Sequence, residues 1–295
     1  MNEMNRRNFL KASAVVGVGA PLVGATISAS AAPARSKLLK SLQYGMLPKK
    51  LSDPDKFALA KKCAFEGLEY NAGTLKDIGK ATQSGKLARQ AGVPIHSLVF
   101  GGWGSPFSSP DSAVIKRGLE GMRAALRSAK ACGADNILLV PAIVNETVSY
   151  GDAWKRSQEH IRKLLGLAKE LKVTISVENV WNKFLLSPLE FARYVDEFDH
   201  PYLKAYFDVG NVILFGYSQD WIRTLGKRLV RIHLKDFKRK GYQWTNLLEG
   251  DVNWPQVRKA LDEVGYKGFL TPELGGGDET YLKDLSGRID KILAM

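Results

Sequence analysis

Short apolar runs alternate with longer amphipathic stretches along most of the chain. A run such as NILLV, at residues 136–140, is apolar at every position, which is typical of a parallel strand covered on both faces. The pattern predicts eight strands, at residues 42–46, 67–71, 94–100, 136–140, 173–178, 204–208, 229–234 and 268–273. It also predicts a helix after each strand, at residues 54 onward, 76–91, 111–131, 152–171, 188 onward, 219–225, 254–264 and 279–293.

Eight strands that alternate with eight helices predict a (β/α)8 barrel, the TIM-barrel fold, formed as one domain. An open, doubly wound sheet is the rival arrangement. Such a sheet usually has a glycine-rich first turn that binds a nucleotide, and the first predicted turn, LPKKLSDP at residues 47–54, contains no glycine. The closed barrel is therefore the favoured fold, and we assign it to residues 35–295.

The N-terminal segment has the layout of an export signal. Arg6 and Arg7 precede a weakly apolar run at residues 12–30, and Ala29-Ser30-Ala31 offers a small-residue cleavage site. We interpret residues 1–34 as a twin-arginine signal peptide, so the Tat export machinery is an expected partner and the location is periplasmic or otherwise exported. A membrane anchor is the alternative, but Pro21 interrupts the run and its hydrophobicity is low for a stable span.

The chain is basic, with a formal charge of +13. Its lysines are spread along the predicted helices and do not alternate with aromatic residues, so we expect a solvated basic surface and no nucleic-acid partner. The two cysteines, Cys63 and Cys132, lie near predicted helix ends in apolar surroundings. They lack the spacing of a metal site, and buried free thiols are expected.

Four side chains of the kinds that bind metals occur at the ends of four successive predicted strands. They are Glu178, Asp208, His233 and Glu273, separated by 30, 25 and 40 residues, or one strand–helix unit per step. Because the carboxyl ends of barrel strands meet at one mouth, these side chains are expected to surround one point. Three carboxylates and an imidazole suit one divalent ion, Mn²⁺, Co²⁺ or Mg²⁺, with Zn²⁺ as an alternative.

The two glutamates also predict proton-transfer chemistry. Glu178 and Glu273 both follow apolar residues, so both should be partly desolvated. Desolvation raises the pKa of a carboxyl group and a bound cation lowers it, so the two effects together can give a base suited to neutral pH. Two such bases on either side of an α-hydroxycarbonyl group could remove a proton from carbon and return it through a metal-stabilised enediolate. Return of the proton to the opposite face epimerises a sugar, and return to the neighbouring carbon isomerises it.

These motifs resemble the xylose-isomerase-like barrels of the sugar phosphate isomerase/epimerase family. The resemblance covers roughly residues 43–293 and is carried by VENVWN, FDVGN, HLKDF, EGDVNW and TPEL. It implies that Glu178, Asp208, His233 and Glu273 hold the ion, and that the two glutamates are the acid/base pair. It further implies that Arg239, six residues beyond the metal histidine, contacts substrate.

Two positions depart from the ketose epimerases of that family. Asn211 stands where many of them have a histidine, and an amide cannot take up a proton at neutral pH. Phe184 replaces a glutamate that contacts substrate. Asn211 remains a candidate for substrate binding as a hydrogen-bonding group. Three other side chains near the predicted mouth are candidates too: Trp103, Lys235 and Asn182.

The leading functional hypothesis is an exported, metal-dependent sugar isomerase or epimerase acting on a small carbohydrate. A metal-dependent lyase is the first alternative, because the same metal and base could eliminate a group from a 3-keto-glycoside or dehydrate a ketoinositol. A non-catalytic carbohydrate-binding barrel is the second alternative. Barrels of this size often pair, so a homo-oligomer is also considered.

Overall fold

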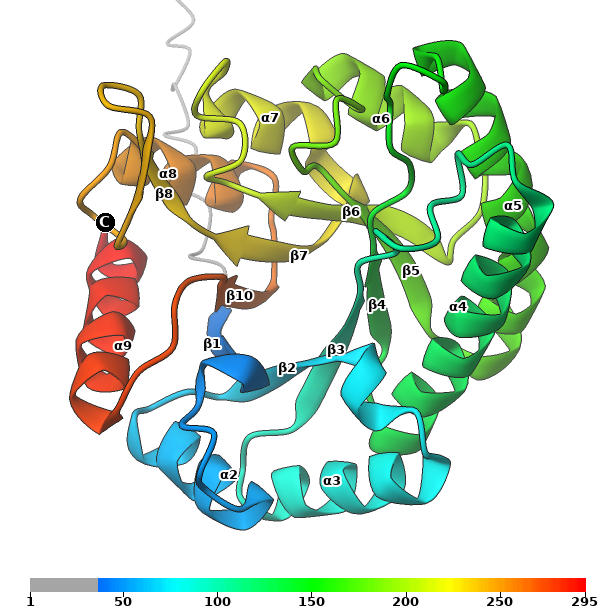
Figure 1. The fold of residues 1–295 in the computed structure, drawn as a ribbon. Helices are drawn as coiled ribbons and strands as arrows, with labels where there is room; N and C mark the ends of the chain where they lie inside the picture. The colour runs from blue at the N-terminus through cyan, green and yellow to red at the C-terminus, as the bar shows by residue number, and fades with distance from the viewer. Residues whose placement is uncertain (1–36) are drawn as a thin grey trace, which may run out of the picture. The chain divides into compact units, whose positions relative to one another are not determined.

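The computed structural model describes residues 37–295, so the predicted signal peptide lies outside the described residues. Eight parallel strands close into a barrel in the order β1-β10-β7-β6-β5-β4-β3-β2, with helices around the outside (Figure 1). The predicted TIM barrel is therefore confirmed. The barrel strands are β1 (Leu38–Gln43), β2 (Gly67–Asn71), β3 (Ile95–Phe100), β4 (Asn136–Leu139), β5 (Thr174–Glu178), β6 (Leu203–Asp208), β7 (Leu229–Leu234) and β10 (Gly268–Pro272).

Most helices begin at a side chain that caps them. Ser52, Ser187 and Asn253 each accept a hydrogen bond from a backbone N–H of the first turn, and a proline follows within the first two helical positions. The helices are α2 (Asp53–Lys62), α3 (Ile78–Gln90), α4 (Ser112–Cys132), α5 (Tyr150–Leu171), α6 (Pro188–Asp196), α7 (Ser218–Leu225), α8 (Trp254–Glu263) and α9 (Glu279–Ala294). Short 3₁₀ turns are η1 (Tyr44–Met46), η2 (Ala72–Leu75) and η3 (Gly226–Arg228).

The first strand lies earlier in the chain than the pattern predicts. β1 spans Leu38–Gln43, and the predicted residues 44–46 form η1 instead. Lys40 interrupts the apolar run, yet its side chain is buried because Nζ lies 2.8 Å from Ser286 Oγ and 2.7 Å from Asp290 Oδ1. The start of β1 was therefore missed, because a charged residue within the strand breaks its apolar pattern.

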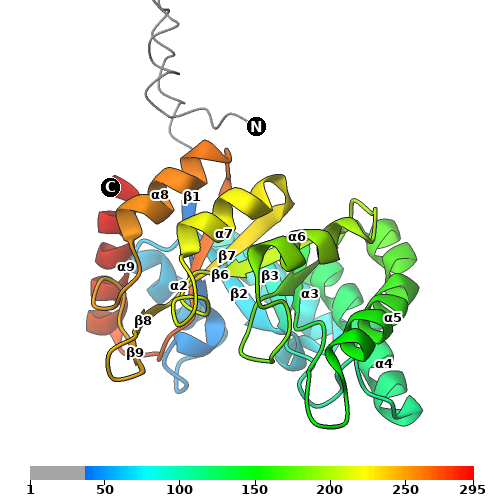
Figure 2. The same ribbon diagram turned by 90° about the horizontal axis from the view of Figure 1, so that it is seen from above.

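A hairpin outside the barrel was not predicted. β8 (Asp236–Lys238) pairs antiparallel with β9 (Gln243–Thr245), and Gly241 and Tyr242 adopt positive φ at the turn between them. Strands of three residues are too short for a hydrophobic alternation. The hairpin lies on the side of the barrel from which the loops after β4 and β5 also project (Figure 2). It therefore belongs to the mouth formed by the carboxyl ends of the strands.

Apolar side chains fill the space between the strands and the helices, and polar groups occupy part of the barrel interior. Asn136 Nδ2 donates to Ser97 Oγ at 3.0 Å, and Ser176 Oγ donates to Asn136 Oδ1, so this buried layer is hydrogen-bonded. Cys63 and Cys132 are free and buried, as predicted. Within residues 37–295, no helix is both long and apolar enough to cross a membrane.

Candidate active site

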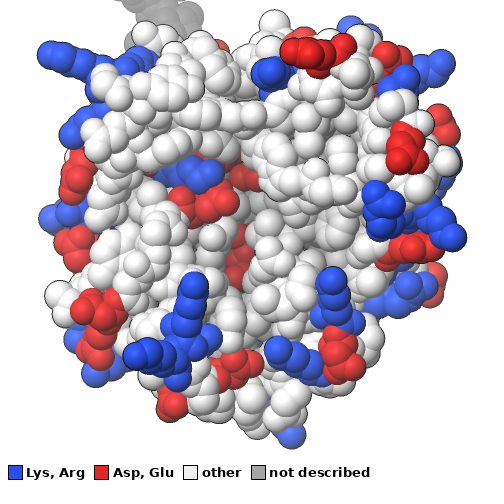
Figure 3. Space-filling model, viewed as in Figure 1, with Lys and Arg blue, Asp and Glu red and all other residues white. Residues whose placement is uncertain are grey.

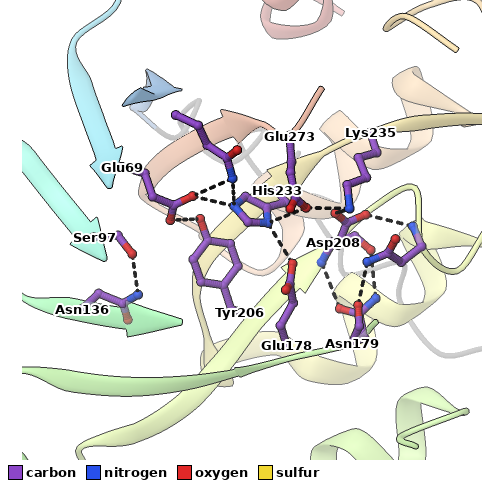
Figure 4. Close-up of polar contacts among 12 residues, drawn as sticks. Glu69, Ser97, Asn136, Glu178, Asn179, Tyr206, Asp208, His233, Lys235 and Glu273 are labelled. Atoms are coloured by element: carbon purple, nitrogen blue, oxygen red, sulfur yellow. Dashed lines mark hydrogen bonds and ion pairs between the residues drawn. The ribbon is translucent and has the colours of Figure 1, made fainter. Parts of the chain in front are cut away.

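The four predicted metal ligands meet at the barrel mouth. Glu178 and Asp208 end β5 and β6, His233 lies near the end of β7, and Glu273 directly follows β10. One ligand atom from each residue lies within 4.8 Å of those of the other three. Glu178, Asp208 and His233 are buried, whereas Glu273 is 36% exposed, and the four side chains point toward one another (Figure 4). The strands thus bring together a set of donors that could hold a single ion.

The contacts within this cluster fit a divalent cation. His233 Nδ1 lies 2.8 Å from Glu178 Oε1 and 3.3 Å from Glu273 Oε2. Asp208 Oδ2 is buried without a hydrogen-bond partner, although Lys235 Nζ lies 3.3 Å away. A buried carboxylate oxygen without a donor is costly unless a cation satisfies it. The cluster could therefore hold a divalent ion, and its identity as Mn²⁺, Co²⁺ or Mg²⁺ stays a prediction.

A third glutamate, Glu69 on β2, contacts the ring nitrogen of His233 that faces away from the cluster. Glu69 Oε2 lies 2.7 Å from His233 Nε2, and Tyr206 Oη donates to Glu69 Oε1 at 2.8 Å. Gln43 Nε2 also donates to Glu69, at 3.2 Å. When Nε2–H donates to Glu69, the Nδ1 lone pair points at the three carboxylates of the cluster. Sequence reasoning missed Glu69; a lone carboxylate in the apolar strand GLEYN was the available signal.

Asn179 fixes the backbone where two ligands are attached. Its Oδ1 accepts from the Asp208 N–H at 2.9 Å, and its Nδ2 donates to the Asp208 carbonyl at 3.0 Å. Asn211 Nδ2 in turn donates to the Asn179 carbonyl at 2.8 Å, and the Asn211 N–H donates to Asp208 Oδ1 at 2.8 Å. The Asn179 side chain and the Asn211 backbone N–H therefore hold Asp208 in position beside the end of β5.

Burial and neighbouring charges shift the pKa values of Glu178 and Glu273 in opposite directions. Burial, which outweighs the attraction of His233, raises the pKa of Glu178 to about 7. Burial also acts to raise the pKa of Glu273, but His233 and Lys235 outweigh it and hold that pKa well below its usual range. For His233, burial acts to lower the pKa, and the carboxylates of Glu69, Glu273 and Glu178 raise it well above the usual range. Burial and charge therefore shift the pKa values of the two neighbouring carboxyl groups in opposite directions.

Lys235 extends from the end of β7 into the cluster. Its Nζ lies 2.5 Å from Glu273 Oε2 and 3.3 Å from Asp208 Oδ2. The sequence made Lys235 a candidate for substrate binding; in the structure it pairs with two carboxylates, and its contact with substrate stays a prediction. Burial opposes the charge on Lys235, but Asp208 and Glu273 raise its pKa above the usual range. The ammonium thus balances part of the negative charge of the cluster.

A cavity of about 670 Å³ opens above the cluster. Figure 3 faces the barrel mouth and shows acidic and basic side chains at the bottom of the central hollow. Glu178 and Glu273 line the cavity, together with three residues predicted to bind substrate: Trp103, Asn211 and Lys235. Pockets of roughly 300–1,000 Å³ enclose small organic ligands, so this cavity has room for a carbohydrate.

Two other residues predicted to bind substrate have protein partners elsewhere and do not line this cavity. The Arg239 guanidinium donates to the carbonyls of Ile213 at 2.7 Å and Gly216 at 3.0 Å. Asn182 is buried, donates to the Ala142 carbonyl at 2.7 Å and accepts from the Phe184 N–H at 3.1 Å. Both side chains order loops around the mouth, and their contact with substrate stays a prediction.

The comparisons with known proteins agree on the barrel and on the N-terminal signal. The family model of the xylose isomerase-like TIM barrel matches residues 57–291, and the model of the twin-arginine translocation signal matches residues 3–20. The second match indicates export by the twin-arginine pathway, as predicted. A putative L-ribulose-5-phosphate 3-epimerase of Escherichia coli is 27% identical over 248 residues, which cover 77% of this chain and 85% of that protein.

Solved structures with a similar fold include two epimerases. D-psicose 3-epimerase from Clostridium cellulolyticum aligns with a TM-score of 0.74 at 18% identity and covers 86% of this chain and 99% of its own. The 3-keto-D-glucoside 4-epimerase of Escherichia coli aligns with a TM-score of 0.73 at 15% identity, covering 88% and 100%. At such low identity the likeness shows the fold.

Proposed function

Since this chain belongs to the xylose isomerase-like TIM barrel family, we propose that it is an exported sugar isomerase or epimerase that depends on a divalent metal. The observation that supports this proposal most strongly is the convergence of Glu178, Asp208, His233 and Glu273 within 4.8 Å. Three of the four are buried, and Glu178 and Glu273 line a cavity that is large enough for a sugar. The epimerase names of the relatives point the same way.

A divalent cation bound by these four residues would act as a Lewis acid and make the C–H bond beside a carbonyl group more acidic. Glu273 is the more exposed carboxylate of the pair and lines the cavity, so it would remove the proton from carbon. Glu178 lies across the cluster and would supply a proton to the opposite face of the same carbon. One proton leaves carbon and one returns, so the two carboxyl groups exchange their protonation states during epimerisation.

We propose a neutral sugar or an oxidised sugar derivative as the substrate. Among the described residues that line the cavity, Lys235 is the only cation, and it is paired with Glu273 and Asp208. A phosphate group is usually bound by cations that are free to pair with it, and Lys235 is already paired with two carboxylates. The Escherichia coli relative is named for a phosphorylated sugar, so we expect this chain to differ from it in substrate.

The deciding experiment is incubation of the Mn²⁺-loaded protein with a panel of ketoses and 3-keto-glycosides in D₂O. Deuterium at the carbon beside the carbonyl, without loss of the sugar, supports proton return. Release of the group β to the carbonyl would instead assign elimination. Absence of exchange with every sugar would contradict both reactions and leave a binding protein.

The Glu178→Gln and Glu273→Gln variants serve as controls for this experiment. Each is expected to lower the exchange rate by at least about 100-fold, since general acid–base catalysis contributes on the order of 10²–10⁴. The far-ultraviolet circular dichroism of both variants should match that of the unchanged protein. Full exchange by either variant would remove that residue from the acid/base pair.

A further inference from the structure

Three exposed aromatic rings form a surface at the rim of the cavity. Trp181 follows β5, and Tyr242 and Trp244 lie on the β8–β9 hairpin. The ring centroid of Trp181 lies 5.0 Å from that of Trp244 and 5.5 Å from that of Tyr242. Trp181 is 38% exposed, Trp244 41% and Tyr242 59%. We call these three rings the aromatic platform.

A buried phenylalanine packs against all three rings of the aromatic platform. Phe237, on β8, is fully buried and meets Trp181 edge to face at 5.6 Å, Trp244 at 5.0 Å and Tyr242 at 5.3 Å. Trp181 Nε1 donates to the Asn211 carbonyl at 2.9 Å, which fixes the plane of the indole. Rings that are already fixed in place lose little entropy when a ligand stacks on them.

The platform is continuous with the catalytic cavity. Trp181 and Trp244 line the same 670 Å³ cavity as Glu178 and Glu273. Trp244 also lines a neighbouring cavity of about 270 Å³, which shares Leu274 and Gly275 with the first. Trp244, Leu274 and Gly275 therefore line both the cavity above the carboxylates and a second hollow beside it.

This space exceeds what one free sugar at the metal cluster would use. The reacting carbon must lie near Glu178 and Glu273 at the floor, whereas the platform lies at the exposed rim. The cavity wall is largely apolar, with Val99, Leu138, Val140 and Val180 among its residues. An apolar wall and exposed rings suit the C–H face of a second ring, because such a face packs on an aromatic ring.

We propose that the platform is a subsite for a second ring, so that the substrate is a glycoside of two rings and not a free monosaccharide. Its carbonyl-bearing sugar would occupy the metal cluster, and its other pyranosyl ring would stack on Trp181 and Trp244. This inference rests on the proposed function for the reaction itself. The subsite sets specificity, and it requires only that a flat ring with an apolar face extends from the reacting sugar.

The first test compares D-fructose with isomaltulose, a fructose that carries a glucosyl ring, in the D₂O exchange assay with Mn²⁺-loaded protein. The unchanged protein should exchange isomaltulose with the higher kcat/KM. Trp244→Ala should lower kcat/KM for isomaltulose roughly tenfold more than for fructose, the loss expected for one stacked ring. Trp244→Phe, which keeps a ring, should recover most of it. Equal losses for both sugars, or a preference for fructose, would overturn the subsite.

The second test measures binding alone, by calorimetry with isomaltulose and with phenyl β-D-glucopyranoside, which has no carbonyl group to react. Trp244→Ala should weaken binding of isomaltulose roughly tenfold. The matched control is Phe215→Ala, which removes an exposed ring that does not line the cavity. Stronger binding of the phenyl glucoside than of isomaltulose would assign the subsite to an aryl group and overturn the glycosyl assignment.

The two tests separate the subsite from the reaction. Binding that depends on Trp244, without exchange of any sugar, would reject the proposed function and retain the subsite. Exchange of fructose, with isomaltulose binding that is indifferent to Trp244, would retain the function and reject the subsite. If Trp244→Ala changes only the oligomeric state in light scattering, the platform is a subunit contact and the subsite is likewise rejected.

Discussion

His233 lies between carboxylates on both sides of its ring. Glu178 and Glu273 approach Nδ1, and Glu69 approaches Nε2. If Nε2–H donates to Glu69, Nδ1 is the nitrogen left to bind an ion, so a residue of β2 would set which nitrogen serves as ligand. The geometry of the candidate metal site thus depends on a side chain more than 160 residues away in the sequence.

We predict that Glu69→Gln lowers the affinity for Mn²⁺ by roughly 10- to 100-fold, the usual effect of losing a partner behind a metal-bound histidine. Titration calorimetry on the metal-free protein provides the measurement. Glu170→Gln, an exposed glutamate on α5, is the matched control and should leave the affinity unchanged. Equal affinities for the Glu69 variant and the unchanged protein would show that Glu69 does not orient the imidazole.

The sequence predicted that Glu178, Asp208, His233 and Glu273 converge, because each lies at or near the end of a barrel strand. It could not predict Glu69, because the spacing argument concerned only the last four strands. It also assigned Arg239 and Asn182 to substrate, although their polar atoms contact backbone groups in the structure. A polar side chain near the barrel mouth can face the cavity or a loop, depending on the conformation of the loop. The local pattern of apolar and polar residues does not encode that conformation.

Two helices pack closely enough to require a glycine. An added Cβ at Gly85, on α3, would lie 2.2 Å from the carbonyl oxygen of Cys132 at the end of α4. Gly166, on α5, has no atom within 4 Å of the same position. The two glycines therefore occupy helices for opposite reasons: one permits contact between helix backbones, and the other only lowers helix propensity.

We predict opposite effects of alanine at these two positions. Gly85→Ala should lower the free energy of unfolding by about 1–3 kcal/mol, because the backbone of α4 must move. Gly166→Ala should raise it by up to about 1 kcal/mol through helix propensity. Denaturant unfolding followed by circular dichroism compares them directly. A stabilised Gly85→Ala protein would mean that α3 and α4 separate at little cost.

At the scale of elements, the sequence predicted most strands and helices to within a few residues. β7 matches its predicted range of 229–234, and β2 matches 67–71. The failures have physical causes: Lys40 is neutralised inside β1 by Asp290 of α9, and the β8–β9 hairpin is held by packing of Phe237 under two tryptophans. Contacts between segments far apart in the chain cannot be seen in a local pattern.

Metal binding should be visible in the stability of the whole molecule. A ligand that binds only the folded state stabilises it by about 2.7 kcal/mol at 100 times its dissociation constant. For a chain of this size we expect Mn²⁺ to raise Tm by roughly 5–10 °C, and a chelator to reverse the rise. The measurement is calorimetry, with Asp208→Asn as the control that should show little shift. An equal rise in that variant would place the binding elsewhere.

Acid should weaken the barrel through His96. This side chain is buried, lies 2.6 Å from Ser41 Oγ and accepts from Arg231 Nε at 3.0 Å. Burial, reinforced by the Arg231 charge, lowers the His96 pKa well below its usual value. The unfolded chain then binds a proton, with a pKa near 6.5, that the folded chain does not bind. The free energy of unfolding therefore falls as the pH drops below about 6.5.

The predicted contribution of this proton is up to about 1.4 kcal/mol per pH unit below that point. Denaturant unfolding between pH 7 and pH 5 gives the slope for the unchanged protein. His96→Gln keeps a hydrogen-bonding side chain but cannot titrate, so its slope should be smaller by this amount. Identical slopes in the two proteins would show that other groups account for the loss in acid.

The barrel closes by pairing β1 with β10, the first and last strands of the described chain. The fourth ligand, Glu273, directly follows β10, and the histidine partner Glu69 comes from β2 near the other end. A ribosome-bound chain lacking its last strand would have neither the seam nor the complete chelate. The segment that closes the ring therefore also supplies the fourth carboxylate of the cluster, so the cluster is complete only when the barrel is closed.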